Sequence, residues 1–173
     1  SCLDVTRTMA RHVMAEARQA VLDMGSPALQ EGRGFPAALQ RVAMELTNGT
    51  SMRVEFSVED TSTLIPPQME LHLLRIGQEA VANAVRHSGA DTIQLSIAAQ
   101  EGGVCLSIKD NGRGFQPNAA PSALSGHFGL LAMQQRANRI GAELTVHSEV
   151  GRGTVVVVAA RARPGLRIGG LVE

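Results

Sequence analysis

The amino-acid sequence predicts an α+β fold, a two-layer sandwich in which helices cover one face of a mixed β-sheet. Some segments repeat apolar residues with a helical period, whereas others alternate apolar and polar residues as strands do. The two kinds of segment do not alternate strictly along the chain, as they would in an α/β architecture. The 173 residues suit one domain with its own hydrophobic core.

Two helices and a strand are predicted first. Apolar residues recur with a helical period over 3–24, and "GSP" ends this helix because Gly and Pro both interrupt it. A second helix is predicted over about 36–47, before "TNGT". A strand follows in "SMRVEFSVED", where Val54, Phe56 and Val58 share one face.

A long helix, a hairpin, another helix and a second hairpin complete the predicted fold. The long helix begins at "IPPQ", since Pro is tolerated in a first turn, and runs through "QEAVANAVRHSGA" at 78–90. The first hairpin joins "DTIQLSIAAQ" to "VCLSIKD" through "EGG". After a Gly- and Ser-rich loop, "FGLLAMQQRANRIG" is predicted to be a helix that ends at Gly141 and turns four residues inward: Leu130, Met133, Ala137 and Ile140.

The second hairpin is predicted in "ELTVHSEV", "GRG" and "TVVVVAA". Its last strand is apolar on both faces, which predicts a central place in the sheet. Residues 161–173 are expected to be a frayed tail.

Composition excludes several classes of protein. Lys plus Arg and Asp plus Glu balance at 16 each, so no net charge favours nucleic acid or an anionic membrane. With four Phe and no Trp or Tyr, an aromatic platform for stacking bases is not expected. Cys2 and Cys105 form no zinc-ligand spacing, and the reduced cytoplasm is the simpler setting. No run of about 18 or more apolar residues occurs, so no membrane contact is expected of this chain.

A polar stripe runs along the helix of "QEAVANAVRHSGA". At about 100° per residue, Arg86, Asn83 and His87 lie roughly 20°, 40° and 80° from Glu79. Apolar residues fill the opposite side, so the stripe is expected to face away from the sheet. Taken alone, this pattern is better explained by a solvated helix face with stabilising side-chain pairs.

Three further motifs contain glycines. In "DNGRGF", Asp110 follows a strand and can accept a hydrogen bond from an exocyclic amine, while Gly112 and Gly114 allow close approach of a ligand. In "SGHFGLLAM", glycines lead into a helix N-terminus that favours phosphate oxygens. "GRGT" at 151–154 is the last motif. The respective alternatives are a tight turn, an ordinary helix N-cap and a plain hairpin turn.

In this order, the four motifs resemble the boxes of the catalytic, ATP-binding domain of sensor histidine kinases, within the wider class of gyrase, Hsp90 and MutL. "QEAVANAVRHSGA" is similar to the N box, and the other three are similar to the glycine boxes. "NAVRHSGA" and "HFGLLAMQQRA" are most similar to the subfamily of nitrate-sensor and lipid-fluidity-sensor kinases. The resemblance covers about 13–160 and implies a Bergerat-type ATP-binding fold.

The resemblance implies ATP and Mg²⁺ as cofactors. In this resemblance Asn83 holds Mg²⁺, and Glu79 orients the acceptor or a water molecule near the γ-phosphate. Arg86 and His87 contact the phosphates. Asp110 is expected to bind the adenine amino group, and the remaining nucleotide contacts fall on Gly112, Gly114, Gly126, Gly129, Leu130, Gly151, Gly153 and Thr154. Residues 116–128 are expected to be the lid over the nucleotide.

The resemblance also implies a domain organisation and partners. Residues 1–25 are expected to end a dimerisation hairpin, 26–160 to form the catalytic domain, and 161–173 to be the tail. His12 is followed by Val13 rather than an acidic residue, so the phosphoacceptor histidine is expected upstream of this chain. The partners implied are that hairpin and a response regulator with a helix-turn-helix output domain, and no nucleic acid directly. The parent protein is expected to be membrane-associated, with this domain in the cytoplasm.

The sequence departs from the family's motifs at two places, and two other functions are possible. Gly25 stands where the family has Arg, and the spacing of Gly126 and Gly129 departs from a bare GxG. The alternatives are a serine kinase of the anti-sigma-factor type, and a nucleotide-binding interaction module that transfers no phosphate. The long first helix favours the histidine kinase over the former, and intact Glu79, Asn83 and Asp110 favour it over the latter.

Overall fold

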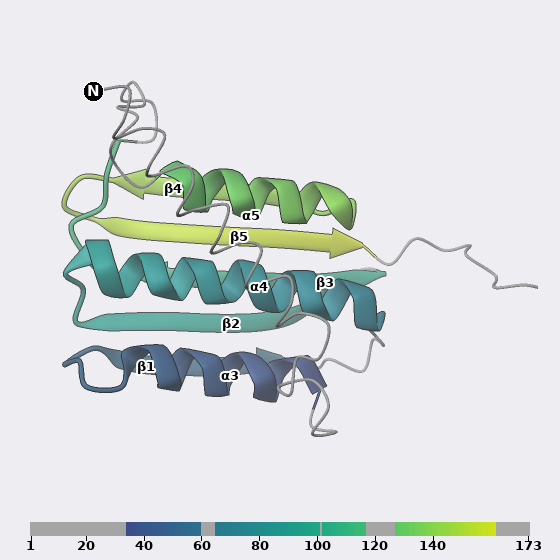
Figure 1. Ribbon diagram of the computed structural model, residues 1–173, viewed down its shortest axis with the longest axis horizontal. Helices are drawn as coiled ribbons and strands as arrows, with labels where there is room; N and C mark the ends of the chain where they lie inside the picture. Colours follow the sequence, from purple (N-terminus) through teal and green to yellow (C-terminus); the bar gives the residue numbers. More distant parts are fainter. Residues whose placement is uncertain (1–33, 60–64, 101, 117–126, 162–173) are drawn as a thin grey trace, which may run out of the picture.

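The structure, a computed structural model, describes residues 34–59, 65–100, 102–116 and 127–161 (Figure 1). Within them, a layer of helices lies over one face of a single five-stranded sheet. The predicted α+β, two-layer class is therefore confirmed. The helix predicted over 3–24, with His12 and Gly25, lies outside the described residues, as does the predicted tail beyond Arg161.

The sheet is mixed, as predicted. Its strand order is β1-β2-β3-β5-β4, with β1 parallel to β2 and every other neighbouring pair antiparallel. The last strand in sequence, β5, is internal, which confirms the central place expected of it. The strands are β1 (Arg53–Glu59), β2 (Thr92–Gln100), β3 (Gly103–Asp110), β4 (Glu143–Glu149) and β5 (Gly153–Arg161).

The helices run nearly along the strands, each over a different part of the sheet (Figure 1). α3 begins two residues before the predicted start and so includes Phe35, which is completely buried. α5 buries Met133 and Ala137 and ends before Gly141, whose φ is 65°. The helices are α3 (Gly34–Thr47), α4 (Pro67–Asn83), the π-helix η1 (Ala84–Ser88) and α5 (His127–Arg139). No helix in these ranges is long and apolar enough to cross a membrane.

The core fills the space between the two layers. Alternate residues of β2 and β3, such as Leu95 and Leu106, face the helices and are almost fully buried. Gly77 lets α3 and α4 pack closely, because a Cβ there would press on Leu39. On the edge strand β1, Val54 and Phe56 are half-buried as expected, but Val58 remains 43% exposed.

Replacing a core leucine of the sheet should destabilise the fold strongly. Leu106→Ala removes a fully buried side chain and leaves a cavity, so the free energy of unfolding should fall by about 2–5 kcal/mol. Leu131→Ala is the matched control, because Leu131 is 56% exposed and its loss should change the stability by less than about 0.5 kcal/mol. Chemical denaturation measures both; equal losses would contradict this description of the core.

Candidate functional site

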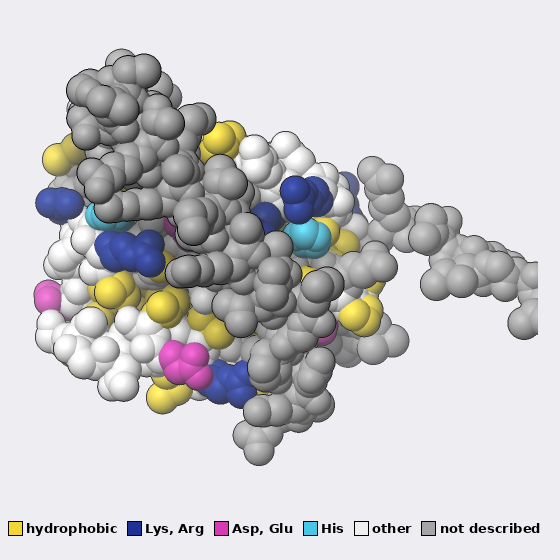
Figure 2. Space-filling view, viewed as in Figure 1, with side chains coloured by type: hydrophobic (Ala, Val, Ile, Leu, Met, Phe, Trp, Pro, Cys, Tyr) yellow, Lys and Arg dark blue, Asp and Glu magenta, His cyan; other side chains and the backbone are white. Residues whose placement is uncertain are grey.

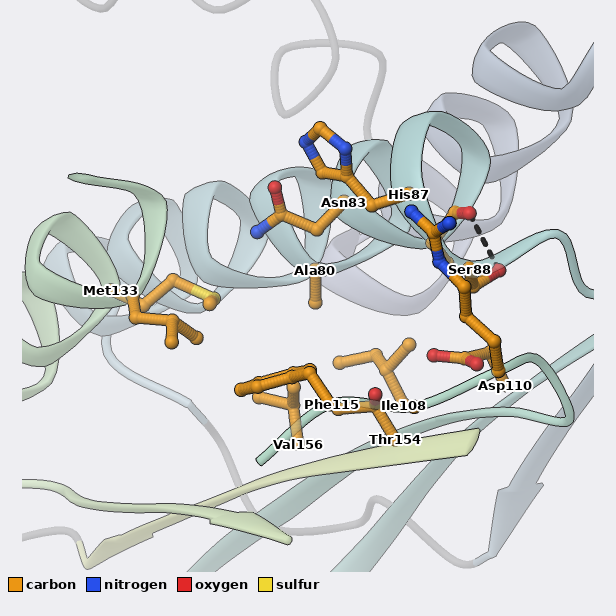
Figure 3. A pocket seen from close by; sticks show the side chains of 14 residues that line it. Ala80, Asn83, His87, Ser88, Ile108, Asp110, Phe115, Met133, Thr154 and Val156 are labelled. Carbon is orange, nitrogen blue, oxygen red and sulfur yellow. Dashed lines mark hydrogen bonds between the residues drawn. The ribbon is translucent and has the colours of Figure 1, made fainter. Parts of the chain in front are cut away.

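A groove of about 490 Å³ lies between the α4–η1 helix, the sheet and α5 (Figure 3). Its roof is the end of α4 with η1, its floor is the ends of β3 and β5, and α5 closes one side. The lining residues are Ala80, Asn83, Ala84, His87, Ser88, Ile108, Asp110, Arg113, Gly114, Phe115, Leu130, Met133, Thr154 and Val156.

The roof combines polar and small side chains. α4 begins after Pro66 with Pro67 in its first turn, and it continues into the π-helix η1 at Ala84. Asn83 and His87 lie side by side along the roof (Figure 3), and Ala80 between them and the floor is small enough to leave space. The groove therefore follows the border between the polar stripe and the apolar side of this helix, and π-helical turns often mark such functional places.

The floor is apolar with one carboxylate at its end. Asp110 and Thr154 are cross-strand partners on β3 and β5, and Ile108 and Val156 form the next pair on the same face. Asp110 is 7% exposed, and its Oδ1 accepts a hydrogen bond from Gly112 N at 2.9 Å. Burial raises the pKa of Asp110, and backbone hydrogen bonds from Gly112 and Thr154 offset part of the rise.

Three of the predicted glycines are required by the chain's own backbone. A Cβ on Gly112 would overlap the carbonyl of Ser88, and one on Gly153 would overlap the carbonyl of Asp110. Gly114, with φ of 59°, packs on the carbonyl of Glu149 in the same way. Of these three, only Gly114 lines the groove. Contacts with the protein's own atoms are therefore enough to require glycine at these three positions. That these glycines contact a nucleotide stays a prediction.

The motif "GRGT" forms a hairpin turn, which was its alternative interpretation. Gly151 has a φ of 82° between β4 and β5, and its N–H donates to the carbonyl of Arg113 at 2.7 Å. Ser148 Oγ accepts from Phe115 N at 2.9 Å and lies 3.0 Å from Thr154 Oγ1. The turn thus fixes the loop after β3 against the start of β5, at the edge of the groove.

The N-terminal turn of α5 packs against the N-box helix. A Cβ on Gly129 would overlap Glu79 Oε1 and approach Asn83 Nδ2 to 3.0 Å. Leu130 lines the groove beside it. Glu79 is half-buried but outside the lining, and Arg86 is exposed and also outside it. Gly126 and most of the predicted lid, 116–128, lie outside the described residues.

The structure thus brings together six of the predicted site residues: Asn83, His87, Asp110, Gly114, Leu130 and Thr154. Sequence reasoning missed lining residues that follow from simple periodicity. Ile108 and Val156 lie two residues from Asp110 and Thr154 on the same strand faces, and Ala80 and Ala84 lie within one helical turn of Asn83. Ser88 and Phe115 are adjacent to predicted residues, but no pattern singled them out.

This arrangement suits a flat heterocycle that has an amino group and a charged substituent. The apolar walls can enclose a ring, and the buried carboxylate can accept its exocyclic N–H. Asn83 and His87 lie where a polar substituent would reach the roof. The described residues contain no group of three His, Cys, Asp or Glu that could hold a metal. A divalent cation here would need oxygen ligands from the bound molecule itself, as Mg²⁺ in phosphate sites does.

Comparisons with known proteins agree with this site. The family model described as "Histidine kinase-, DNA gyrase B-, and HSP90-like ATPase" matches residues 68–164. The nitrate/nitrite sensor protein NarQ of Escherichia coli (strain K12) is 36% identical over 132 residues, which are 76% of this chain and 23% of that protein. The sensor histidine kinase LiaS of Bacillus subtilis (strain 168) is 31% identical over 153 residues, which are 87% and 41%, respectively.

A solved structure is similar over the same region. The ATP-binding domain of PrrB from Mycobacterium tuberculosis has a TM-score of 0.58 and 25% identity, covering 71% of this chain and 90% of that one. Fold and groove therefore define an ATP-binding domain of the class shared by histidine kinases and Hsp90. The chain belongs to the histidine kinase-, DNA gyrase B- and HSP90-like ATPase family, and it is similar to part of a sensor histidine kinase. It spans less than half the length of these two curated relatives.

Neutralising the buried carboxylate should stabilise the empty domain. Because burial raises the pKa of Asp110 in the folded state, folding loses stability as the pH rises from the unfolded pKa through the folded one. Asp110→Asn keeps an oxygen that can accept from Gly112 N and has no charge to bury. Its melting temperature should exceed that of the wild type near neutral pH, and the difference should shrink in acid. A constant difference across this pH range would contradict the stated cause.

Proposed function

We propose that this domain transfers the γ-phosphate of Mg²⁺-bound ATP to a histidine on a dimerisation hairpin of the same protein. The observation that carries the proposal is the placing of Asp110 and Asn83 at opposite sides of one groove with apolar walls. The names of the relatives, which include sensor histidine kinases, support the phosphotransfer. The acceptor hairpin would belong to the same protein, and a response regulator with a helix-turn-helix output domain would be its partner.

The adenine ring would lie on the apolar floor. Ile108 and Val156 provide that floor, and Met133 provides a wall from α5 (Figure 3). Asp110 would accept the hydrogen bond of the adenine amino group, and Thr154 would help through a water molecule. A hydrogen-bonding partner at the end of a dry slot discriminates strongly against a base that lacks the donor, since the carboxylate would then stay buried and unpaired.

The phosphates would lie along the roof. The amide oxygen of Asn83 suits Mg²⁺, whose other ligands would be phosphate oxygens and water. His87 and Arg86 would neutralise the charge of the transferred phosphate, and the N-terminal turn of α5 at Gly129 adds favourable N–H groups. Glu79, beside Gly129, would orient the acceptor near the γ-phosphate. Charge stabilisation and positioning supply most of the catalysis in phosphoryl transfer.

The surface of the described helix face is compatible with this role. Basic, acidic and apolar side chains are interspersed over the described part of the helix face (Figure 2), in keeping with a nucleotide rather than a nucleic acid as ligand. ATP is the phosphate donor, so the proposal places the domain in the cytoplasm.

Asn83→Ala should make nucleotide binding insensitive to Mg²⁺, because the protein's own ligand to the ion is lost. Calorimetric titration with ATP, with and without Mg²⁺, measures the effect. Asn138→Ala is the matched control, since Asn138 is an exposed asparagine on α5 whose Oδ1 accepts a hydrogen bond from the exposed Gln134. An undiminished Mg²⁺ dependence in Asn83→Ala would refute the metal role.

Phosphotransfer itself should be seen when this chain, labelled ATP and the dimerisation hairpin of its own protein are mixed. The expected product is acid-labile phosphate on a hairpin histidine, absent with Asp110→Ala and retained with Asp91→Ala, whose side chain is exposed. ATP binding without any labelled protein would indicate an interaction module. Acid-stable label on serine would indicate a kinase of the anti-sigma-factor type.

A further inference from the structure

Ser88 joins several parts of the site by hydrogen bonds. It is the last residue of η1, it is 8% exposed, and it lines the groove between the roof and the floor (Figure 3). Its hydroxyl donates to the carbonyl of Ala84 at 2.7 Å and accepts from Ala90 N at 2.9 Å. The side chain therefore holds both the π-helical turn and the chain that leaves it.

The backbone of the same residue reaches the loop that follows β3. Ser88 O accepts from Arg113 N at 2.8 Å, and Gly112 lies so close to Ser88 that no Cβ would fit between them. Gly112 N in turn donates to Asp110 Oδ1. A continuous series of bonded neighbours thus leads from Ala84 in the roof to the carboxylate at the end of the floor.

A second connection runs alongside the first. Asn111 Oδ1 accepts from Asp91 N at 3.1 Å and from Thr92 N at 3.0 Å, which ties the same loop to the start of β2. These two bonds fix the loop to the sheet and do not involve η1. Among the described residues, the hydrogen bond from Arg113 N to Ser88 O links η1 to the loop that follows Asp110. The hydroxyl of Ser88 holds the turn that presents this carbonyl.

The proposed nucleotide site has two halves, one on the helix of the roof and one on the sheet. Asn83 and His87 belong to α4 and η1, whereas Asp110 ends β3. A single ligand can satisfy both halves only if their separation is held to a fraction of an ångström. Because the roof packs on the sheet mainly through small or apolar side chains, a hydrogen-bonded connection at the end of η1 is well placed to fix that separation.

We propose that Ser88 is a positioning residue that holds Asn83 and His87 at the distance from Asp110 that an adenine nucleotide requires. The inference rests on the proposed nucleotide site and deepens it. Ser88 would not bind the phosphates itself. It would fix the turn that presents the phosphate-binding side chains.

The test is Ser88→Ala, which keeps the Cβ and removes only the hydroxyl. The affinity for Mg²⁺-bound ATP should fall by about tenfold, the lower end of the loss that follows when a residue orienting a metal ligand is removed. The affinity for adenosine should change little, because the bond from Gly112 to Asp110 stays in place. Competition against a fluorescent adenine nucleotide measures both affinities.

Thr47→Val is the matched control for the loss of a hydroxyl. Thr47 is 7% exposed, and its Oγ1 donates to the carbonyl of Ala43 at 2.9 Å, the same bond to the fourth preceding residue that Ser88 makes. Thr47 ends α3 and is not among the lining residues of the groove. Both variants should lower the melting temperature to a similar extent, but only Ser88→Ala should change the ratio of ATP to adenosine affinity.

The outcomes separate this inference from the proposed function. If the wild-type chain fails to bind Mg²⁺-bound ATP, the proposed function itself is wrong. If the wild type binds and Ser88→Ala loses ATP and adenosine equally, or loses neither, Ser88 has no positioning role. An equal change of the ratio in Thr47→Val would also overturn it, because the effect would then follow from general loss of stability.

Discussion

The burial of one carboxylate, Asp110, at the end of an otherwise apolar floor is the constraint on which the site depends. An ionised group in this environment loses water, and backbone N–H groups from Gly112 and Thr154 offset part of the loss. The backbone next to this residue is tightly packed: a Cβ on Gly112 would overlap the carbonyl of Ser88, and one on Gly153 would overlap the backbone carbonyl of Asp110. This packing accounts for Gly112 and Gly153 among the motif glycines.

The layer architecture explains why the groove is open above the carboxylate. α4 buries large side chains such as Leu73 and Ile76 before it reaches the groove, whereas Ala80 near its end and Ala84 at the start of η1 are small. The shorter side chains leave a space between helix and sheet at the C-terminal end of α4. The floor beneath this space is supplied by β3 and β5, neighbours in the sheet. The same packing that forms the core therefore also shapes the site.

Much of this architecture could be predicted from the sequence, because its signals are local. The two hairpins, the mixed sheet, the internal β5 and the inward residues Met133 and Ala137 all follow from periodicity and turn residues. The combination of four weak motifs also located Asn83, His87, Asp110 and Thr154 in one groove.

The remainder depends on contacts between distant segments. The π-helical turn at 84–88 has no distinctive local sequence, and it changes which residues of the helix meet the groove. Arg86, which simple helical geometry placed beside Glu79, is exposed outside the lining. The fit of Gly112 against Ser88 could not be predicted either, since it requires knowing that two loops meet.

The pairing of Asp110 with Thr154 has a consequence for how the domain folds. These cross-strand partners are far apart in sequence, and α5 and β4 lie between them in the chain. Bringing two distant strands together costs chain entropy, but that cost grows only slowly with the length of the chain between them. A molecule bound across this junction would strengthen the longest-range pairing of the sheet.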